Sequence, residues 1–257
     1  MELLHKLVVV GLLLFIIYKY YFKKYDSSGA MGNISSPYQK ILSKSELTDF
    51  LLENSDNYYD RFNNIDLQVR NVSNIEEYKK KIKNSPVNIN DYLKNIIIDT
   101  TKKIDEKFKN YKIIGFDGNK ANTIKWSIGI IDGLDYEAGH PHTRDNIIII
   151  SKNLISSNNL LRVLLHEKVH VYQKIFKEDI KLYLKSNNFS ISNYNNNSRA
   201  NPDTDGFTYI NQDNNQMLCL YNNNPKSIMD VTYYPNNLPM YEHPFEFMAY
   251  TVENNLV

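Results

Sequence analysis

The stretch Leu160-Leu-Arg-Val-Leu-Leu-His-Glu-Lys-Val-His-Val-Tyr-Gln173 contains an H-E-x-x-H motif at His166, Glu167 and His170. Residues four apart lie one turn apart on the same face of an α-helix, so both imidazoles can bind one ion while Glu167 flanks the open coordination position. Zn²⁺ lowers the pKa of its bound water towards neutrality, and a neighbouring carboxylate can accept the proton. The motif therefore predicts a hydrolytic metal site with two histidine ligands and Glu167 as the general base.

The segment around the motif is largely apolar, which is typical of a buried helix. Such a helix does not bury two histidines and a glutamate without partners, because unpaired buried polar groups cost several kcal/mol. A chance H-E-x-x-H in a chain with 6 His among 257 residues has a probability of about 0.01. The pattern favours one bound Zn²⁺ ion over a core helix with two satisfied histidines.

The composition excludes several classes of protein. Lysine and arginine number 30 and the acidic residues 29, so the net charge of +1 gives no support to nucleic-acid binding. Cys219 is the only cysteine, which excludes an internal disulfide framework and a cysteine-based zinc finger. The chain is long enough for one sizeable domain with appendages. Its abundance of Asn, Lys, Ile and Tyr is typical of an AT-rich genome, such as that of a large DNA virus or a protist.

An uncharged run at 7–18 predicts a membrane anchor. Extended to 3–22, with lysines and tyrosines near its ends, the run has the roughly twenty residues that a transmembrane helix requires. No small-residue cleavage site follows closely, which favours a retained signal anchor at 1–25 over a cleaved signal peptide. Residues 26–36 are small and polar and are expected to form a linker.

The charges beside this run predict its orientation. Lys19, Lys23 and Lys24 follow the run, whereas Glu2 and Lys6 precede it. This excess of lysine places the folded domain on the cytoplasmic side or in a virion interior. Four N-glycosylation triplets favour the opposite side, although an Asn-rich chain produces such triplets by chance; they begin at Asn33, Asn71, Asn188 and Asn196.

The first part of the folded region, 37–110, is predicted to be helical. Helical patterns run over 37–53, with Ser36 as the expected N-cap, and over 74–83 and 90–108. We expect this part to precede the core that carries the motif.

From 111 onwards the pattern changes to short strands. Runs at 112–116, 123–131 and 146–151 are rich in β-branched and aromatic residues and predict a small mixed sheet. The last of these strands leads, through a cap at 156–159, into the H-E-x-x-H helix.

The residues after the motif helix have weaker patterns. A short helix is expected at 178–185, and short strands are expected at 207–210 and 216–220. The rest of 186–240 is Asn-rich and interrupted by prolines, which is typical of loops or hairpins that shape access to a site. A helical period returns behind Pro244.

His166-Glu167-x-x-His170, followed about seventy residues later by Pro244-Phe-Glu246-x-x-Ala249 on a second helix, resembles the gluzincin zinc metallopeptidases. The resemblance covers roughly 110–257 and implies that Glu246 is the third zinc ligand. Pro244 at the first helical position would place Glu246 third, on a rigid element, and Ala249 would let the two helices approach closely. Glu242 or His243 in the preceding turn is the alternative ligand.

The sequence departs from this family at one position. Many gluzincins have an aspartate four residues after the zinc glutamate, which supports a histidine ligand, whereas this chain has Tyr250. The supporting acceptor is therefore expected to be Asp230, Glu253 or a backbone carbonyl. The long zinc signature of the metzincins is absent.

The resemblance also implies a His or Tyr side chain that stabilises the transition state. His142, in the turn with His140 before the last strand, is one candidate, although an exposed polar turn is the alternative. The other candidates are His243, Tyr241 and Tyr209.

Together these patterns predict an α+β fold, with a zincin-like core at 111–257 that contains a small mixed β-sheet, the motif helix and a C-terminal helix. Helices and an N-terminal transmembrane helix precede this core. The predicted function is a membrane-anchored zinc metallopeptidase that acts on a peptide or protein substrate. The alternatives are a catalytically inactive zincin-fold structural or adaptor protein and a hydrolase of non-peptide amides. The presence of Glu167, which is not needed to hold a metal, favours an enzyme.

Overall fold

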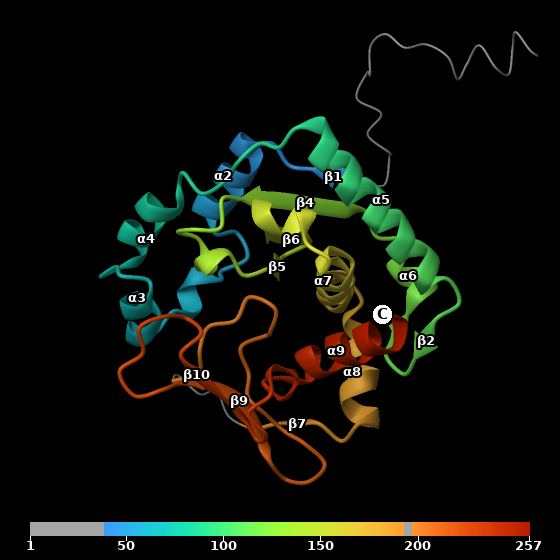
Figure 1. Cartoon of the computed structure of the whole chain (residues 1–257). Helices are drawn as coiled ribbons and strands as arrows, with labels where there is room; N and C mark the ends of the chain where they lie inside the picture. Colours follow the sequence, from blue (N-terminus) through green and yellow to red (C-terminus); the bar gives the residue numbers. More distant parts are fainter. Residues whose placement is uncertain (1–38, 193–196) are drawn as a thin grey trace, which may run out of the picture. The chain divides into compact units, whose positions relative to one another are not determined.

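The computed structural model describes residues 39–192 and 197–257, which form an α+β structure (Figure 1). Its α-helices are α2 (Lys44–Glu53), α3 (Asn64–Val69), α4 (Ile75–Ile82), α5 (Asp91–Phe108), α6 (Gly118–Ala121), α7 (Leu160–Ile175), α8 (Lys177–Ser186) and α9 (Pro244–Leu256). Its strands are β1 (Gln39–Ile41), β2 (Lys112–Ile113), β3 (Phe116–Asp117), β4 (Trp126–Ile131), β5 (His142–Arg144), β6 (Ile147–Ser151), β7 (Ser190–Ile191), β8 (Tyr209–Ile210), β9 (Gln216–Tyr221) and β10 (Val231–Tyr234).

The predicted membrane anchor at 3–22 and the linker at 26–36 lie outside the described residues. Within 39–192 and 197–257, no helix is long and apolar enough to cross a membrane. The helical part predicted at 37–110 shares its core with the later residues, because β1 pairs with β4 and α5 packs against α7. Residues 37–257 accordingly form one unit.

A four-stranded sheet with the order β1-β4-β6-β5 forms the centre of this unit. β1, β4 and β6 are parallel, and β5 runs antiparallel to β6 at one edge. A strand that is covered on both faces needs apolar residues at successive positions, which explains the continuous isoleucine run at 147–150 in β6. A small mixed sheet is present as predicted, with the predicted runs at 123–131 and 146–151 at its centre, but the run at 112–116 is not part of it.

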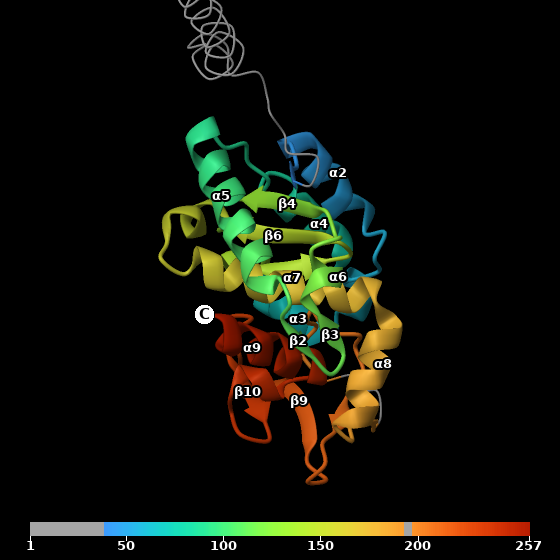
Figure 2. The same ribbon diagram turned by 90° about the vertical axis from the view of Figure 1, so that its right-hand side faces the viewer.

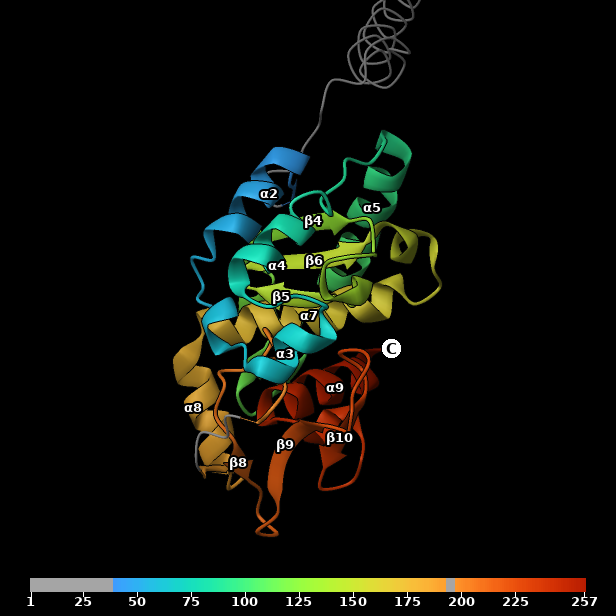
Figure 3. The same ribbon diagram turned by 90° about the vertical axis from the view of Figure 1, so that its left-hand side faces the viewer.

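Helices cover both faces of this sheet (Figures 2 and 3). α5 and α7 share one hydrophobic core with Ile128 and Ile130 of β4. α2 and α4 share a second core with Ile149 of β6, on the opposite face. α2 approaches the sheet at Gly129, where a Cβ atom would lie 2.7 Å from Leu47 Cδ1.

The helix predicted at 37–53 begins later than expected. Gln39–Ile41 form β1 beside β4, and α2 begins at Lys44. The Ser43 side chain accepts a hydrogen bond from the Glu46 N–H, and the Glu46 carboxylate accepts one from the Ser43 N–H at 2.8 Å. The prediction was wrong at its start because pairing with β4 keeps the chain extended up to this reciprocal cap.

Most other predicted elements are present. α4, α5 and α8 lie where helices were expected at 74–83, 90–108 and 178–185. The strand predicted at 112–116 is instead a hairpin, in which β2 pairs with β3. The strand predicted at 123–131 begins only at Trp126.

The Asn-rich region after α8 contributes a second, antiparallel sheet with the order β10-β9-β8-β7. β8 and β9 correspond to the short strands predicted at 207–210 and 216–220. The C-terminal helix α9 lies between α7 and this sheet (Figures 2 and 3). The chain thereby places α9 directly against the helix that carries the motif.

The contact between Gly129 and Leu47 gives a test of this packing. We expect Gly129→Ala to lower the free energy of unfolding by about 1–3 kcal/mol, because the added methyl group overlaps a buried leucine. In a Leu47→Ala background the same change should cost almost nothing, because the space is free. Urea unfolding of the two single variants and the double variant measures the coupling. An equal cost in both backgrounds would contradict the close approach of α2.

Candidate metal centre

α7 holds the H-E-x-x-H motif on a helix that is buried over most of its length. Its apolar residues fix the rotation of the helix by filling the core, with Leu164, Leu165 and Val169 fully buried. The helix begins at Leu160, after a short 3₁₀ helix at Lys152–Ser156, and no side chain caps it. The N-cap residue Asn159 lies within the predicted cap at 156–159, but its side chain makes no capping hydrogen bond.

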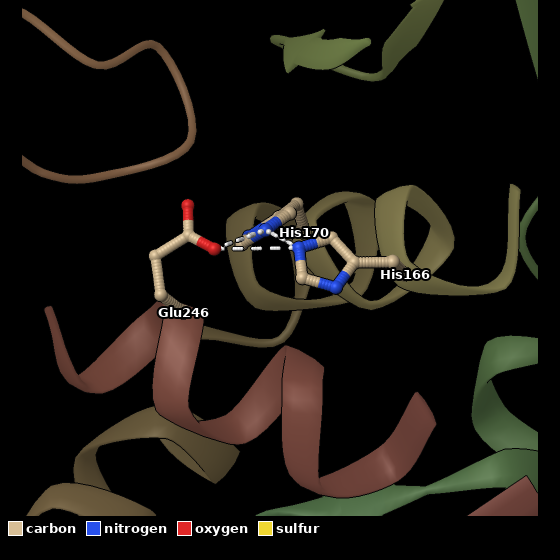
Figure 4. A group of neighbouring side chains, drawn as sticks. All are labelled: His166, His170 and Glu246. Atoms are coloured by element: carbon tan, nitrogen blue, oxygen red, sulfur yellow. Dashed lines mark hydrogen bonds and ion pairs between the residues drawn. The ribbon is translucent and has the colours of Figure 1, made fainter. Parts of the chain in front are cut away.

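Three possible ligand atoms meet between α7 and α9 (Figure 4). The Nε2 atoms of His166 and His170 are 3.1 Å apart. Oε2 of Glu246 lies 3.3 Å from His166 Nε2 and 3.6 Å from His170 Nε2. All three side chains are almost completely buried. The structure thus brings together the three residues that the sequence predicted as ligands.

These separations fit a tetrahedral zinc site. Zn–N bonds of about 2.0–2.1 Å and Zn–O bonds of about 2.0–2.2 Å place neighbouring ligand atoms about 3.3–3.5 Å apart in a tetrahedron. The observed separations of 3.1, 3.3 and 3.6 Å lie around this value. If each imidazole carries its proton on Nδ1, the two Nε2 lone pairs face each other, and a cation between them would be favourable.

The other nitrogen of each histidine has an acceptor. His166 Nδ1 lies 2.7 Å from Glu253 Oε2, and His170 Nδ1 lies 2.9 Å from Gln173 Oε1. The Gln173 side-chain amide also donates to the Phe245 carbonyl, which fixes its orientation. A proton held on Nδ1 leaves the Nε2 lone pair free for a metal. Of the three predicted supporting acceptors, Glu253 is the one that contacts His166 Nδ1.

The electrostatic environment favours positive charge at this centre. Burial opposes the charged imidazole, but the hydrogen bonds that it donates to the carboxylates of Glu246 and Glu253 raise the pKa of His166 well above its usual value. Burial likewise opposes the charge of His170, and the charges of Asp203 and Glu246 raise its pKa. The pKa of Glu246 is well below its usual value, because the two histidines outweigh the effect of burial. A bound divalent cation would balance the same negative charge without protonation of the two histidines.

Glu167 is buried beside this centre and lines the adjoining cleft. Its Oε2 lies 3.0 Å from Thr143 Oγ1, on the edge strand β5. Burial, followed by the negative charge of Asp203, raises the pKa of Glu167 to about 8. A metal ion beside Glu167 would lower its pKa. A carboxyl group in this environment can exchange a proton near neutral pH.

The alternative ligands Glu242 and His243 are engaged elsewhere. The Glu242 carboxylate pairs with the Arg199 guanidinium at 2.8 Å. His243 is the N-cap of α9: its Nδ1 accepts from the Phe245 N–H, and its Nε2 lies 3.0 Å from Asp205 Oδ1. The geometry therefore favours Glu246, which lies in the first turn of α9 as the sequence predicted.

Three of the four predicted transition-state donors do not line the cleft. They are His243, Tyr209 and Tyr241. The Tyr209 hydroxyl donates to Asp205 instead, and the Tyr241 ring packs against Phe247.

The fourth predicted donor, His142, lines the cleft, but both of its ring nitrogens are engaged. They lie 2.9 Å from the His140 carbonyl oxygen and 3.1 Å from the Tyr136 hydroxyl. Burial lowers its pKa. His142 is therefore held in the cleft wall by two hydrogen bonds.

His140 and Tyr250 are better placed to contact a substrate. Both line a cleft of about 540 Å³ that extends from the metal centre. His140 is exposed, and the Tyr250 ring lies edge-on to the ring of His166, with centroids 4.6 Å apart. Tyr250 lies four residues after Glu246 in α9 and carries a hydroxyl group that can donate a hydrogen bond.

Sequence reasoning missed the segment 199–205, Arg-Ala-Asn-Pro-Asp-Thr-Asp, whose residues 199–203 line the cleft. Asn201 Nδ2 donates to Glu246 Oε1 at 3.2 Å. Asp203 Oδ1 accepts from the Thr143 N–H at 2.7 Å. Local patterns could indicate only a turn around Pro202, because the partners lie about 40 to 60 residues away in the sequence.

The turn before β5 has an unusual backbone. Glu137, Ala138 and Gly139 have consecutive φ values of 46°, 49° and 75°. The first two are unfavourable for residues with a side chain. The buried Glu137 carboxylate accepts two hydrogen bonds from Arg70, at 3.1 and 2.6 Å, and one from Tyr78. This ion pair holds the turn that leads to His140.

Comparisons of the chain with models of protein families, with curated proteins and with solved structures find no match.

The Glu137 ion pair predicts a dependence of stability on pH. Although burial opposes its charge, Arg70 lowers the pKa of Glu137 to about 2 from an unfolded value of about 4.5. The contribution of the charged Glu137 carboxylate to the free energy of unfolding is therefore complete above pH 4.5 and is lost as the pH falls towards 2. Glu137→Gln should lower the free energy of unfolding by about 3 kcal/mol at pH 7, because Arg70 loses a buried partner. It should also reduce the dependence of stability on pH between 2 and 4.5.

Urea unfolding between pH 2 and pH 7 measures both effects. Glu178→Gln is the matched control, because its ion pair with Lys181 is exposed and should contribute at most about 0.5 kcal/mol. Equal effects of the two substitutions would contradict the role of the buried pair.

Proposed function

We propose that this protein is a membrane-anchored, zinc-dependent metallopeptidase of the gluzincin type. The observation that carries the proposal is the convergence of His166, His170 and Glu246 at separations that suit tetrahedral zinc. Glu167, which is not one of these three possible ligands, lies beside them in the same cleft. Peptide or protein chains are the proposed substrates.

The number of protein ligands supports catalysis rather than a structural role for the metal. Structural zinc sites are usually closed by four protein ligands, whereas catalytic sites have three and leave one position for water or substrate. The group His166, His170 and Glu246 has three members within the described residues. The adjoining cleft of about 540 Å³ gives a substrate access to the fourth position.

The chain's own residues can perform the remaining steps. A bound Zn²⁺ would supply a water of lowered pKa and would polarise the substrate carbonyl. Glu167, positioned by Thr143, accepts the proton as the carbonyl carbon is attacked and transfers it to the leaving amine. Tyr250 and His140 face the cleft and can donate hydrogen bonds to the oxygen on which negative charge develops.

The fold and the location are part of the same proposal. A mixed sheet with an edge strand beside the motif helix, and a C-terminal helix that carries Glu246, support a zincin-like core. The uncharged run at 3–22 would tether this core to a membrane, on the cytoplasmic side or in a virion interior. An inactive, zinc-containing adaptor and a hydrolase of non-peptide amides are the competing functions.

Glu167→Gln separates catalysis from metal binding. We expect the full-length variant to retain about one zinc ion per chain, as the parent should, because the three ligands are unchanged. Hydrolysis of casein or of a peptide library should fall by at least about 10²-fold, because the amide cannot accept a proton. Metal analysis and digestion, with and without chelator, measure both properties.

Parent-like turnover in Glu167→Gln would contradict the assigned base. Zinc bound to a parent that hydrolyses neither peptides nor simple amides would favour the adaptor function.

Single substitutions test which acidic residue binds the metal. Glu246→Ala should lower zinc affinity strongly, because it removes a ligand, whereas Glu242→Gln should retain the metal, because Glu242 pairs with Arg199. Zinc retained after mild chelation measures the difference. Loss of zinc from Glu242→Gln alone would overturn both the ligand assignment and the gluzincin proposal.

A further inference from the structure

Asn201 is a buried residue of the segment 199–205, and its side chain reaches the carboxylate of Glu246. The two oxygens of that carboxylate have different surroundings. Oε2 faces both histidines, at 3.3 and 3.6 Å. Oε1 accepts a hydrogen bond from Asn201 Nδ2 at 3.2 Å. The difference is relevant because a carboxylate can bind a metal through one oxygen or through both.

The orientation of the Asn201 amide is fixed independently of Glu246. Its Oδ1 accepts the Asp203 N–H at 2.9 Å, so the NH₂ group must point towards Glu246. Its backbone carbonyl accepts from the Thr204 hydroxyl at 3.1 Å. The next carbonyl, of Pro202, accepts from Lys174 of α7 at 2.7 Å. The donor is therefore held in place by its own loop and by the motif helix.

We propose that Asn201 is a positioning residue that restricts Glu246 to one-oxygen metal binding. The hydrogen bond occupies Oε1 and keeps it directed away from the histidines, so that Oε2 alone completes the ligand set. This inference rests on the proposed function only in that Glu246 is taken as a metal ligand. It extends that function, because the Asn201 hydrogen bond would keep one coordination position open for substrate and water.

The chemical reason is competition for the same carboxylate oxygen. Without the Asn201 donor, Oε1 would lose this hydrogen-bond partner, and a metal ion bound at Oε2 would be an alternative partner for it. Two-oxygen binding would raise the coordination number and occupy the position that a catalytic site leaves open. Loss of an outer partner of a ligand typically lowers metal affinity about 10–100-fold.

The test uses Co²⁺ bound to the full-length protein, because its visible absorption is more intense with four ligands than with five or six. Asn201→Ala removes the donor and leaves a space, whereas Asn201→Leu removes the donor and fills the space. Both variants should bind Co²⁺ and Zn²⁺ about 10–100-fold more weakly than the parent and should show weaker Co²⁺ absorption. Catalytic activity is not needed for either measurement.

Asn122→Ala is the matched control, because the Asn122 amide donates to the Asp105 carbonyl at 2.8 Å, away from the metal centre. Its spectrum and affinity should equal those of the parent. The proposal is overturned if Asn201→Leu restores the parent spectrum and affinity, since packing rather than donation would then be responsible. It is also overturned if neither Asn201 variant differs from the parent.

The two proposals fail in different ways. A parent protein that binds neither Co²⁺ nor Zn²⁺ would overturn both the role of Asn201 and the proposed function. A parent that binds one ion and hydrolyses no amide, while the Asn201 variants lose four-coordinate absorption, would overturn only the peptidase function.

Discussion

The packing of α9 against α7 is the constraint on which the candidate site depends. Ala249 and Val252 are fully buried at this contact, and the small side chain of Ala249 lets the helices approach closely. Hydrogen bonds join the two helices on either side of the ligand atoms, because Gln173 donates to the Phe245 carbonyl and Arg162 pairs with Glu253. The rotation of each helix is thereby fixed, and only then do the imidazoles meet Glu246.

The acidic groups buried near the contact of α7 and α9 need positively charged or hydrogen-bonding partners. The cleft region buries several acidic groups, and a buried charge is tolerated only when it is paired or hydrogen-bonded. Arg70 pairs with Glu137, and Arg199 pairs with Glu242. Glu246 faces two imidazoles and one amide hydrogen, and its charge can be balanced by protonated histidines or by the proposed metal ion. The ion pairs and the proposed metal site follow from the same electrostatic requirement.

The segment 199–205 connects the two sides of the cleft. Asn201 contacts Glu246 of α9. The Asp203 carboxylate accepts a hydrogen bond from the Thr143 N–H on the edge strand β5. An edge strand with free N–H groups can pair with another chain, and this carboxylate covers one such group. Thr143 in turn contacts Glu167. The same segment therefore contacts Glu246, the proposed third ligand, and supports Thr143 beside Glu167, the proposed base.

The sequence by itself determined the elements with strong local signals. The apolar period around the motif predicted a buried helix, and Pro244 predicted the start of α9 with Glu246 in its first turn. It misplaced the start of α2, because the pairing of β1 with β4 joins residues about 87 positions apart. Tertiary structure alone decided that Glu253 supports His166 and that Asn201 holds Glu246. Helical periodicity is encoded within a few neighbouring residues, whereas these hydrogen bonds form between distant segments only after the core has packed.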